Sequence, residues 1–156
     1  MRLHICSVGR MKPGPGRTLT EDYLARFDRT ARGLGIGPAR VVEVEDKKGG
    51  GRAAEAALLE RASPSGAVIC ALDERGAPLT SPEFAKMLAE WRDAGHRDAA
   101  FLIGGADGLD PGLRDRADRV LSLGNMVWPH MLARVMLSEQ LYRAASILAG
   151  LPYHRN

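Results

Sequence analysis

The chain has 156 residues, 45% of them hydrophobic and 5% aromatic, and it carries a formal net charge of +3. No apolar run reaches the length of a membrane span, and the first residues are too polar for a secretion signal, so we expect a cytoplasmic protein. The length fits one domain, 1–156, and the low aromatic content predicts an aliphatic core. Cys6 and Cys70 lie in apolar runs and the four histidines lack metal-ligand spacing, which argues against a disulfide framework and predicts no metal.

Apolar runs with the spacing of strands alternate with segments of helical spacing. In chain order, the pattern predicts strand 3–9, helix 18–34, strand 40–45, helix 53–62, strand 66–73, helix 81–94, strand 99–105, a short helix from Asp110–Pro111, strand 119–124 and helix 129–150. We expect Thr18 and Glu21 to form a capping box, and Ser81 before Pro82 to cap the third helix. Strands that alternate with helices predict an α/β fold with a mainly parallel sheet.

The positive charge is concentrated in the first third of the chain. Residues 1–52 hold 11 Lys and Arg against 6 Asp and Glu, a net +5, whereas residues 53–156 hold 11 against 13, a net −2. A phosphate-rich partner would bind such a basic surface. A solvated surface without a partner explains a charge excess of this size equally well.

Three loops that follow predicted strands are unusual. They are Leu72–Asp73 before a turn at 74–81, the glycine-rich IGGADG at 103–108, and SLGNMVWPH at 122–130. Parallel strands bring such loops to one edge of the sheet, where ligands bind in α/β proteins. The adjacent Gly104 and Gly105 allow a ligand close to the backbone, although a tight turn would also need glycine. No dinucleotide fingerprint, phosphate-binding loop or nucleophile elbow is present.

The third loop places the apolar residues 126–128 just before helix 129–150. They either cap the core or line a pocket for a flat ring. No residue with a capping side chain precedes this helix, so its first N–H groups are available to an anion. Arg134, flanked by apolar residues near the loop, is a candidate to hold that anion.

Four motifs occur in order: ALDERGAPLTSPEFA (71–85), FLIGGADGL (101–109), SLGNMVWPHMLARVMLSEQLYRA (122–144) and PYHRN (152–156). With HICSVGRMK near the start, they resemble the RlmH family of SPOUT-type methyltransferases over nearly the whole chain. The resemblance implies methylation of ring nitrogen N3 of a pseudouridine in bacterial 23S rRNA of the large ribosomal subunit, with S-adenosylmethionine (SAM) as donor. It also implies a C-terminal trefoil knot, and a homodimer with each active site near the subunit interface.

The family's SAM contacts carry over onto residues in the three loops. They are Leu72, Gly105, Gly124, Asn125, Met126, Val127, Trp128 and Pro129. The chain departs from the family pattern at Gly124 and Val127, where the family has a serine and a threonine. Contacts at these two positions would therefore come from the backbone.

Methylation of a ring N3–H requires loss of its proton, and a histidine is suited to this near neutral pH. With the resemblance, His154 is the first candidate base and His130 the second. Arg155 or Arg134 would stabilise the developing uracil anion, and Tyr153 would stack on the base or hydrogen-bond its carbonyl. Without the resemblance, His154 would be an exposed terminal residue with no role.

Two other functions compete with this interpretation. One is a non-catalytic RNA-binding module of the same fold that has lost the cofactor. The other is a nucleotide-binding enzyme that holds phosphates with the glycine loop at 103–108. The absence of a lysine, serine or threonine from that loop counts against the second alternative.

Overall fold

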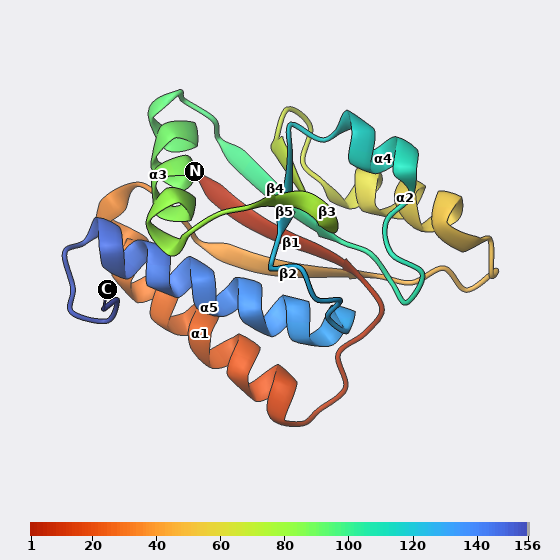
Figure 1. Cartoon of the computed structure of the whole chain (residues 1–156), viewed down its shortest axis with the longest axis horizontal. Coiled ribbons are helices and arrows are strands. Elements are labelled where there is room, and N and C mark those ends of the chain that lie inside the picture. The colour runs from red at the N-terminus through yellow and green to blue at the C-terminus, as the bar shows by residue number, and fades with distance from the viewer. Residues whose placement is uncertain (156) are drawn as a thin grey trace.

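A computed structural model describes residues 1–155 of the chain, so Asn156 of the PYHRN motif lies outside the described residues. Five parallel strands form one sheet in the order β2-β1-β4-β3-β5 (Figure 1). They are β1 (Arg2–Val8), β2 (Ala39–Val44), β3 (Val68–Pro78), β4 (Asp98–Ile103) and β5 (Arg119–Ser122). The predicted α/β fold with a parallel sheet is confirmed.

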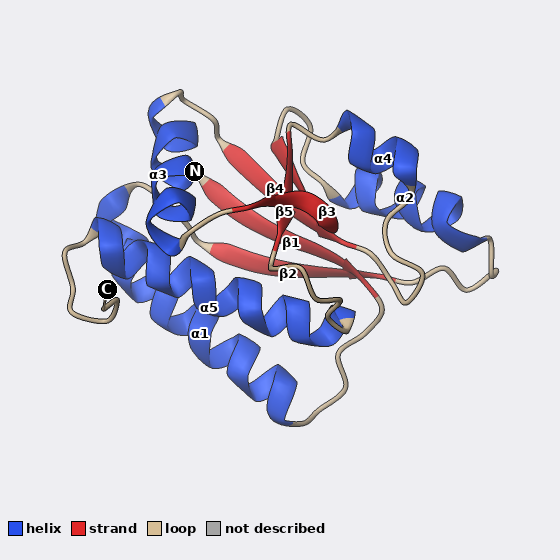
Figure 2. Cartoon of the chain, viewed as in Figure 1, coloured by secondary structure: helices blue, strands red, loops and turns tan. Residues whose placement is uncertain are grey.

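Helices cover both faces of the sheet (Figure 2). They are α1 (Pro15–Ala31), with a 3₁₀ turn η1 (Arg32–Leu34) after it, α2 (Gly51–Ala62), α3 (Ser81–Asp93), α4 (Pro111–Arg116) and α5 (His130–Leu148). Helices α1, α3 and α5 pack on one face, and α2 and α4 pack on the other. Each predicted helix is present, with bounds that differ by a few residues.

Side chains of the strands point alternately into two cores, as expected for strands buried on both faces. Ile5, Cys70 and Phe101 belong to the core under α1, α3 and α5. Cys6 and Leu102 belong to the core under α2 and α4. Both cysteines are free and buried, so the prediction that they are core residues is confirmed. Burial raises the pKa of the Cys70 thiol to about 12, which keeps it protonated at neutral pH.

Two helix starts differ from the prediction. Helix α1 begins at Pro15 after Gly14, because proline has the fixed φ that a first helical position needs. Thr18 therefore lies inside the helix, where its hydroxyl donates to the Gly14 carbonyl at 3.1 Å, and it forms no capping box. Helix α3 does have a capping box, but Thr80 forms it with Glu83, one residue before the predicted Ser81 cap.

The segment predicted as a turn after strand 66–73 is instead a continuation of β3. Leu72 and Ala77 both pair with Leu121 of β5, so the four residues between them bulge out of the ladder. Gly76 makes this possible, because a Cβ atom there would lie 2.6 Å from the Val120 carbonyl oxygen. The bulge, 73–76, forms one wall of the cavity described next.

Candidate functional site

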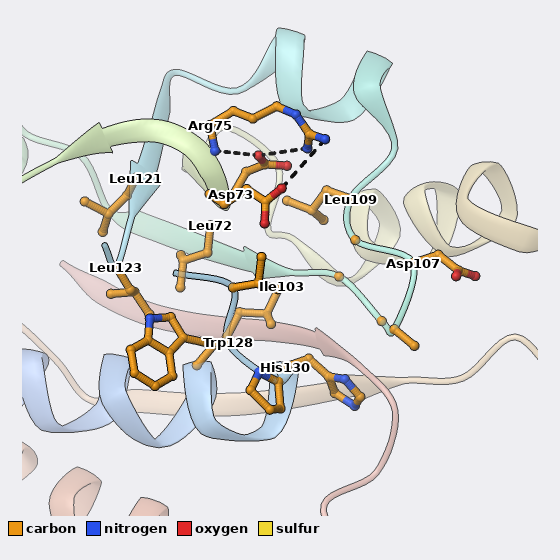
Figure 3. Close-up of a pocket in the computed structure, with 18 of the residues that line it drawn as sticks. Leu72, Asp73, Arg75, Ile103, Asp107, Leu109, Leu121, Leu123, Trp128 and His130 are labelled. Atoms are coloured by element: carbon orange, nitrogen blue, oxygen red, sulfur yellow. Dashed lines mark hydrogen bonds and ion pairs between the residues drawn. The ribbon is translucent and has the colours of Figure 1, made fainter. Parts of the chain in front are cut away.

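A cavity of about 740 Å³ opens at the carboxyl ends of β3, β4 and β5. Its walls come from the bulge of β3, the glycine loop after β4 and the loop between β5 and α5. Asp73 and Arg75 lie on one side of the cavity, and Trp128 and His130 lie on the opposite side (Figure 3). The prediction that the three loops meet at one edge of the sheet is therefore confirmed.

Ion pairs fix the wall that the β3 bulge provides. The Asp73 carboxylate is only 5% exposed and accepts hydrogen bonds from the Arg75 backbone N–H at 2.9 Å and its guanidinium at 3.3 Å. Arg114 of α4 approaches the same carboxylate at 3.6 Å. Asp73 belongs to the first of the three loops predicted to carry chemistry, whereas sequence reasoning gave Arg75 and Arg114 no role.

The glycine loop is a tight turn in which Gly105 bridges to Gly108. A Cβ atom at Gly104 would lie 2.5 Å from the carbonyl carbon of Gly108, so the turn excludes any side chain there. Gly108 itself has a φ of +76°, which favours glycine. Thus Gly104 and Gly108 are needed by the turn, and Gly105 is the glycine that the turn alone does not explain.

The loop between β5 and α5 leaves apolar side chains in solvent. Ser122 anchors its start, since its hydroxyl donates to the Gly124 carbonyl at 2.7 Å. Met126, Val127 and Trp128 are 71%, 75% and 40% exposed. Exposed apolar side chains in one stretch mark a surface that another molecule covers.

Most residues expected to contact a cofactor surround the cavity. Those among its lining residues are Leu72, Gly105, Gly124, Met126, Val127, Trp128 and Pro129. Asn125 lies between two lining residues without being one itself. Leu72 and Pro129 are 57 positions apart in the sequence, and the structure brings both to the wall of the same cavity.

His130 is the histidine that lines the cavity. It begins α5 after Pro129, and no side chain caps this helix, as predicted. Its imidazole packs on Gly9 at the end of β1, because a Cβ atom at Gly9 would lie 3.8 Å from His130 Nε2. His130 therefore stands where the end of β1, the start of α5 and the cavity meet.

Acidic side chains lie beside the glycine loop. A Cβ atom at Gly105 would lie 3.3 Å from the Glu55 carboxylate of α2. Partial burial raises the pKa of Glu55, the nearby Asp107 and Asp46 raise it further, and His130 lowers it. Sequence reasoning did not single out Glu55, since α2 shows no motif.

Arg134 is not at the cavity surface. Its guanidinium is fully buried and donates to Glu43 Oε1 at 2.8 Å and to the Gly9 carbonyl at 3.1 Å. Arg134 is also not among the residues that line the cavity. This corrects the expectation that Arg134 holds an anion at the loop mouth, because its hydrogen bonds are made inside the protein.

The C-terminal tail packs along α5 and not over the cavity. The Tyr153 hydroxyl donates to Glu139 Oε1 at 3.0 Å, and its ring centre lies 4.5 Å from that of Tyr142. Arg143 covers the Tyr153 ring at 4.8 Å and approaches His154 Nδ1 at 3.4 Å. Burial and the Glu139 carboxylate raise the pKa of the Tyr153 phenol.

A single chain therefore keeps the tail apart from the cavity. Glu139 lies nine residues beyond His130, which is about 13 Å along the helix axis at 1.5 Å per residue. Tyr153, His154 and Arg155 are not among the residues that line the cavity. Of the candidate catalytic residues, one chain brings only His130 to this site.

Within residues 1–155, no group of three or more His, Cys, Asp or Glu could hold a metal ion. Across the same residues, no helix combines the length and apolar character that a membrane span requires.

Comparison with known proteins gives full-length matches. A family model described as "Predicted SPOUT methyltransferase" matches residues 1–154. A protein of Dinoroseobacter shibae named "Ribosomal RNA large subunit methyltransferase H" is 70% identical over 155 residues, 99% of each chain. Proteins of the same name from Roseobacter denitrificans and Ruegeria pomeroyi are 67% and 66% identical, covering 100% and 99% of each chain.

Proposed function

Since the chain belongs to the SPOUT methyltransferase family, we propose that it transfers a methyl group from SAM to ring nitrogen N3 of a pseudouridine in bacterial 23S rRNA. The single observation that carries this proposal is the cavity at the strand ends, which the three motif loops of the family resemblance enclose. An rRNA substrate implies that the enzyme acts in the cytoplasm. The family also implies that the C-terminal part of the chain is threaded as a trefoil knot.

The cavity is suited to SAM in size and lining. Its volume of about 740 Å³ is within the range of small-molecule sites. Ile103, Leu109 and Trp128 offer apolar surface to a flat ring. The acidic Asp107, which lines the cavity, and Glu55 beside Gly105 favour a cationic ligand. SAM would be held by Leu72, Gly105, Gly124, Asn125, Met126, Val127, Trp128 and Pro129. When bound, it supplies a methyl group activated on a sulfonium.

The chain's own part in the reaction is to position the acceptor base and remove its N3 proton. His130 and His154 are the two candidate bases. His130 lines the cavity of its own chain. His154 belongs to the tail, which in the single chain lies along α5 and away from the cavity.

We therefore propose a homodimer in which the tail of one copy completes the site of the other. Its Tyr153 would contact the acceptor base, and its Arg155 would stabilise the developing anion. Residues 126–128 line the cavity, and together with the exposed Leu132 of α5 they offer apolar surface that such a dimer would bury. A homodimer also accounts for a tail that lies along α5 in the single chain.

The basic first third offers a surface for the rRNA backbone. Lys47 and Lys48 lie in the exposed loop between β2 and α2, and Arg52 extends this surface to the cavity wall. Cations beside the acceptor site would hold phosphates and make binding salt-dependent. The surface thus adds RNA affinity at the place where the base must enter.

The test combines SAM titration calorimetry with methylation assays on free 23S rRNA, large subunits and assembled ribosomes. We expect SAM binding, and one new methyl group on a pseudouridine N3, located by mass spectrometry. His154→Ala is expected to lower methylation at least about 100-fold, as for loss of a general base, with SAM affinity unchanged.

The outcomes separate the alternatives. No SAM binding, with rRNA affinity retained, would favour the non-catalytic RNA-binding module. Full turnover in His154→Ala would remove this residue from the reaction and leave His130 as the base.

A further inference from the structure

Arg134 is the largest side chain that is fully buried within residues 1–155. Its guanidinium reaches three groups, namely Glu43 of β2 at 2.8 Å, the Gly9 carbonyl at 3.1 Å and the Val8 carbonyl at 3.5 Å. The same Glu43 oxygen accepts a hydrogen bond from the Met11 backbone N–H at 3.0 Å. Arg134 and Glu43 together thus hold both ends of the segment that leaves β1, 8–11.

This segment carries the surface on which His130 rests. Gly9 has a φ of +87°, and its Cα faces the His130 imidazole and the Met131 side chain. His130 precedes Arg134 by four residues, so the two side chains leave α5 on the same side, one turn apart. One turn of α5 is therefore attached to the segment by hydrogen bonds, and the preceding turn contacts it through His130.

We propose that Arg134 is a positioning residue that holds the segment 8–11 against α5 and thereby fixes the His130 imidazole at the wall of the cavity. Its importance for turnover depends on the proposed methyltransferase function. Its effect on the placement of His130 does not depend on that function, and it can be measured separately.

The chemistry of arginine explains why this residue type is needed. A planar guanidinium can bind a carboxylate and a carbonyl on different edges at once, whereas a lysine ammonium is a compact charge. Burial lowers the pKa of Arg134, and the Glu43 carboxylate opposes that shift. The guanidinium Nε has no hydrogen-bond partner in residues 1–155. The Arg134–Glu43 pair therefore positions the segment 8–11 without satisfying every donor of the guanidinium.

The test uses Arg134→Met in the full chain, with imidazole nitrogen NMR of ¹⁵N-histidine-labelled protein. The His130 signal is assigned by its loss in His130→Gln. We expect Arg134→Met to shift or broaden the His130 signal. Turnover should fall about 100-fold, the size expected for a reacting group displaced by about 1 Å, while SAM affinity changes less than about threefold.

A second variant separates positioning from simple loss of stability. Arg134→Met combined with Glu43→Leu removes both the buried guanidinium and its 31% exposed carboxylate partner, so that neither charge is left without the other. We expect this double variant to keep the melting temperature of the parent and still show the displaced His130 signal and low turnover. Arg116→Met removes an arginine from the exposed pair with Glu60 on α2 and should alter none of these readouts.

An unchanged His130 signal in both Arg134 variants would overturn the proposal, whatever happens to turnover. If the parent protein methylates no rRNA, the proposed function fails, and the NMR measurement alone still decides whether Arg134 positions His130.

Discussion

At the scale of single residues, Gly104 shows how closely the cavity wall is built. Its missing side chain is required by the backbone of Gly108, and not by a ligand. A methyl group there would force apart the turn that presents Gly105 to the cavity. The donor site thus depends on a residue that need not touch the donor.

We predict that Gly104→Ala weakens SAM binding at least about tenfold and lowers the free energy of unfolding by about 1–3 kcal/mol, the usual cost of overpacking. Titration calorimetry and denaturant unfolding measure the two effects. Gly33→Ala is the matched control, because Gly33 has an ordinary φ and no neighbouring atom within 4 Å of its Cβ position. Parent-like SAM affinity in Gly104→Ala would contradict the role given to this turn.

Sequence reasoning was most successful for structural features that a short local pattern determines. The three motif loops were predicted to meet because parallel strands end on the same side, and they do meet. The burial of Arg134 was not predictable, because its partner Glu43 is 91 positions away. The roles of the individual site residues stay predictions, since they depend on a donor, an acceptor base and a second copy of the chain.

At the scale of elements, charged side chains stabilise the edge of the sheet opposite the cavity. Asp98 at the start of β4 accepts hydrogen bonds from Arg2 and His4 of β1, each at 2.8 Å. Chiefly through Arg2, and with His4 adding, these contacts hold the pKa of Asp98 below its ordinary value. They join the central strand β4 to its neighbour β1 at the end of the sheet opposite the cavity.

This shift predicts a dependence of stability on pH. Because the pKa is lower in the folded state, the stabilisation is complete above the unfolded pKa of about 4 and is lost as the pH falls through the folded value. Denaturant unfolding from pH 6 to pH 3 should therefore show a steeper decline for the parent than for Asp98→Asn. Asp115→Asn, at an exposed position, should follow the parent. Parallel curves for the parent and Asp98→Asn would refute the prediction.

The elements also show why boundaries were harder to predict than strands. Apolar runs, and the alternation of apolar and polar residues at 40–45, located all five strands. The extension of β3 to Pro78 was missed because the bulge at 73–76 is polar and looks like a turn. Its pairing depends on Leu121, which is 44 positions beyond Ala77.

At the scale of the whole molecule, the separation of tail and cavity predicts complementation between copies. Co-expression of Gly104→Ala with His154→Ala produces mixed dimers. If the tail acts on the partner, each mixed dimer contains one intact site, and we expect about a quarter of parent turnover from the mixture. Each variant alone should be nearly inactive in the rRNA methylation assay when SAM is kept well below the Kd of Gly104→Ala.

An inactive mixture would contradict this prediction. If each tail served its own chain, no mixed dimer would contain an intact site, and the mixture would stay inactive. Light scattering on the purified mixture establishes that dimers are present before activity is compared.

The position of Trp128 has a practical consequence. The chain has two tryptophans, and the other, Trp91, packs against Phe101 with ring centres 6.2 Å apart. Trp91 is thus half-buried against the core, whereas Trp128 is 40% exposed and lines the cavity. Trp128 lines the cavity and Trp91 does not, so a molecule that enters the cavity should change the emission of Trp128 alone. The unlabelled protein therefore carries an intrinsic fluorescent probe of cavity binding.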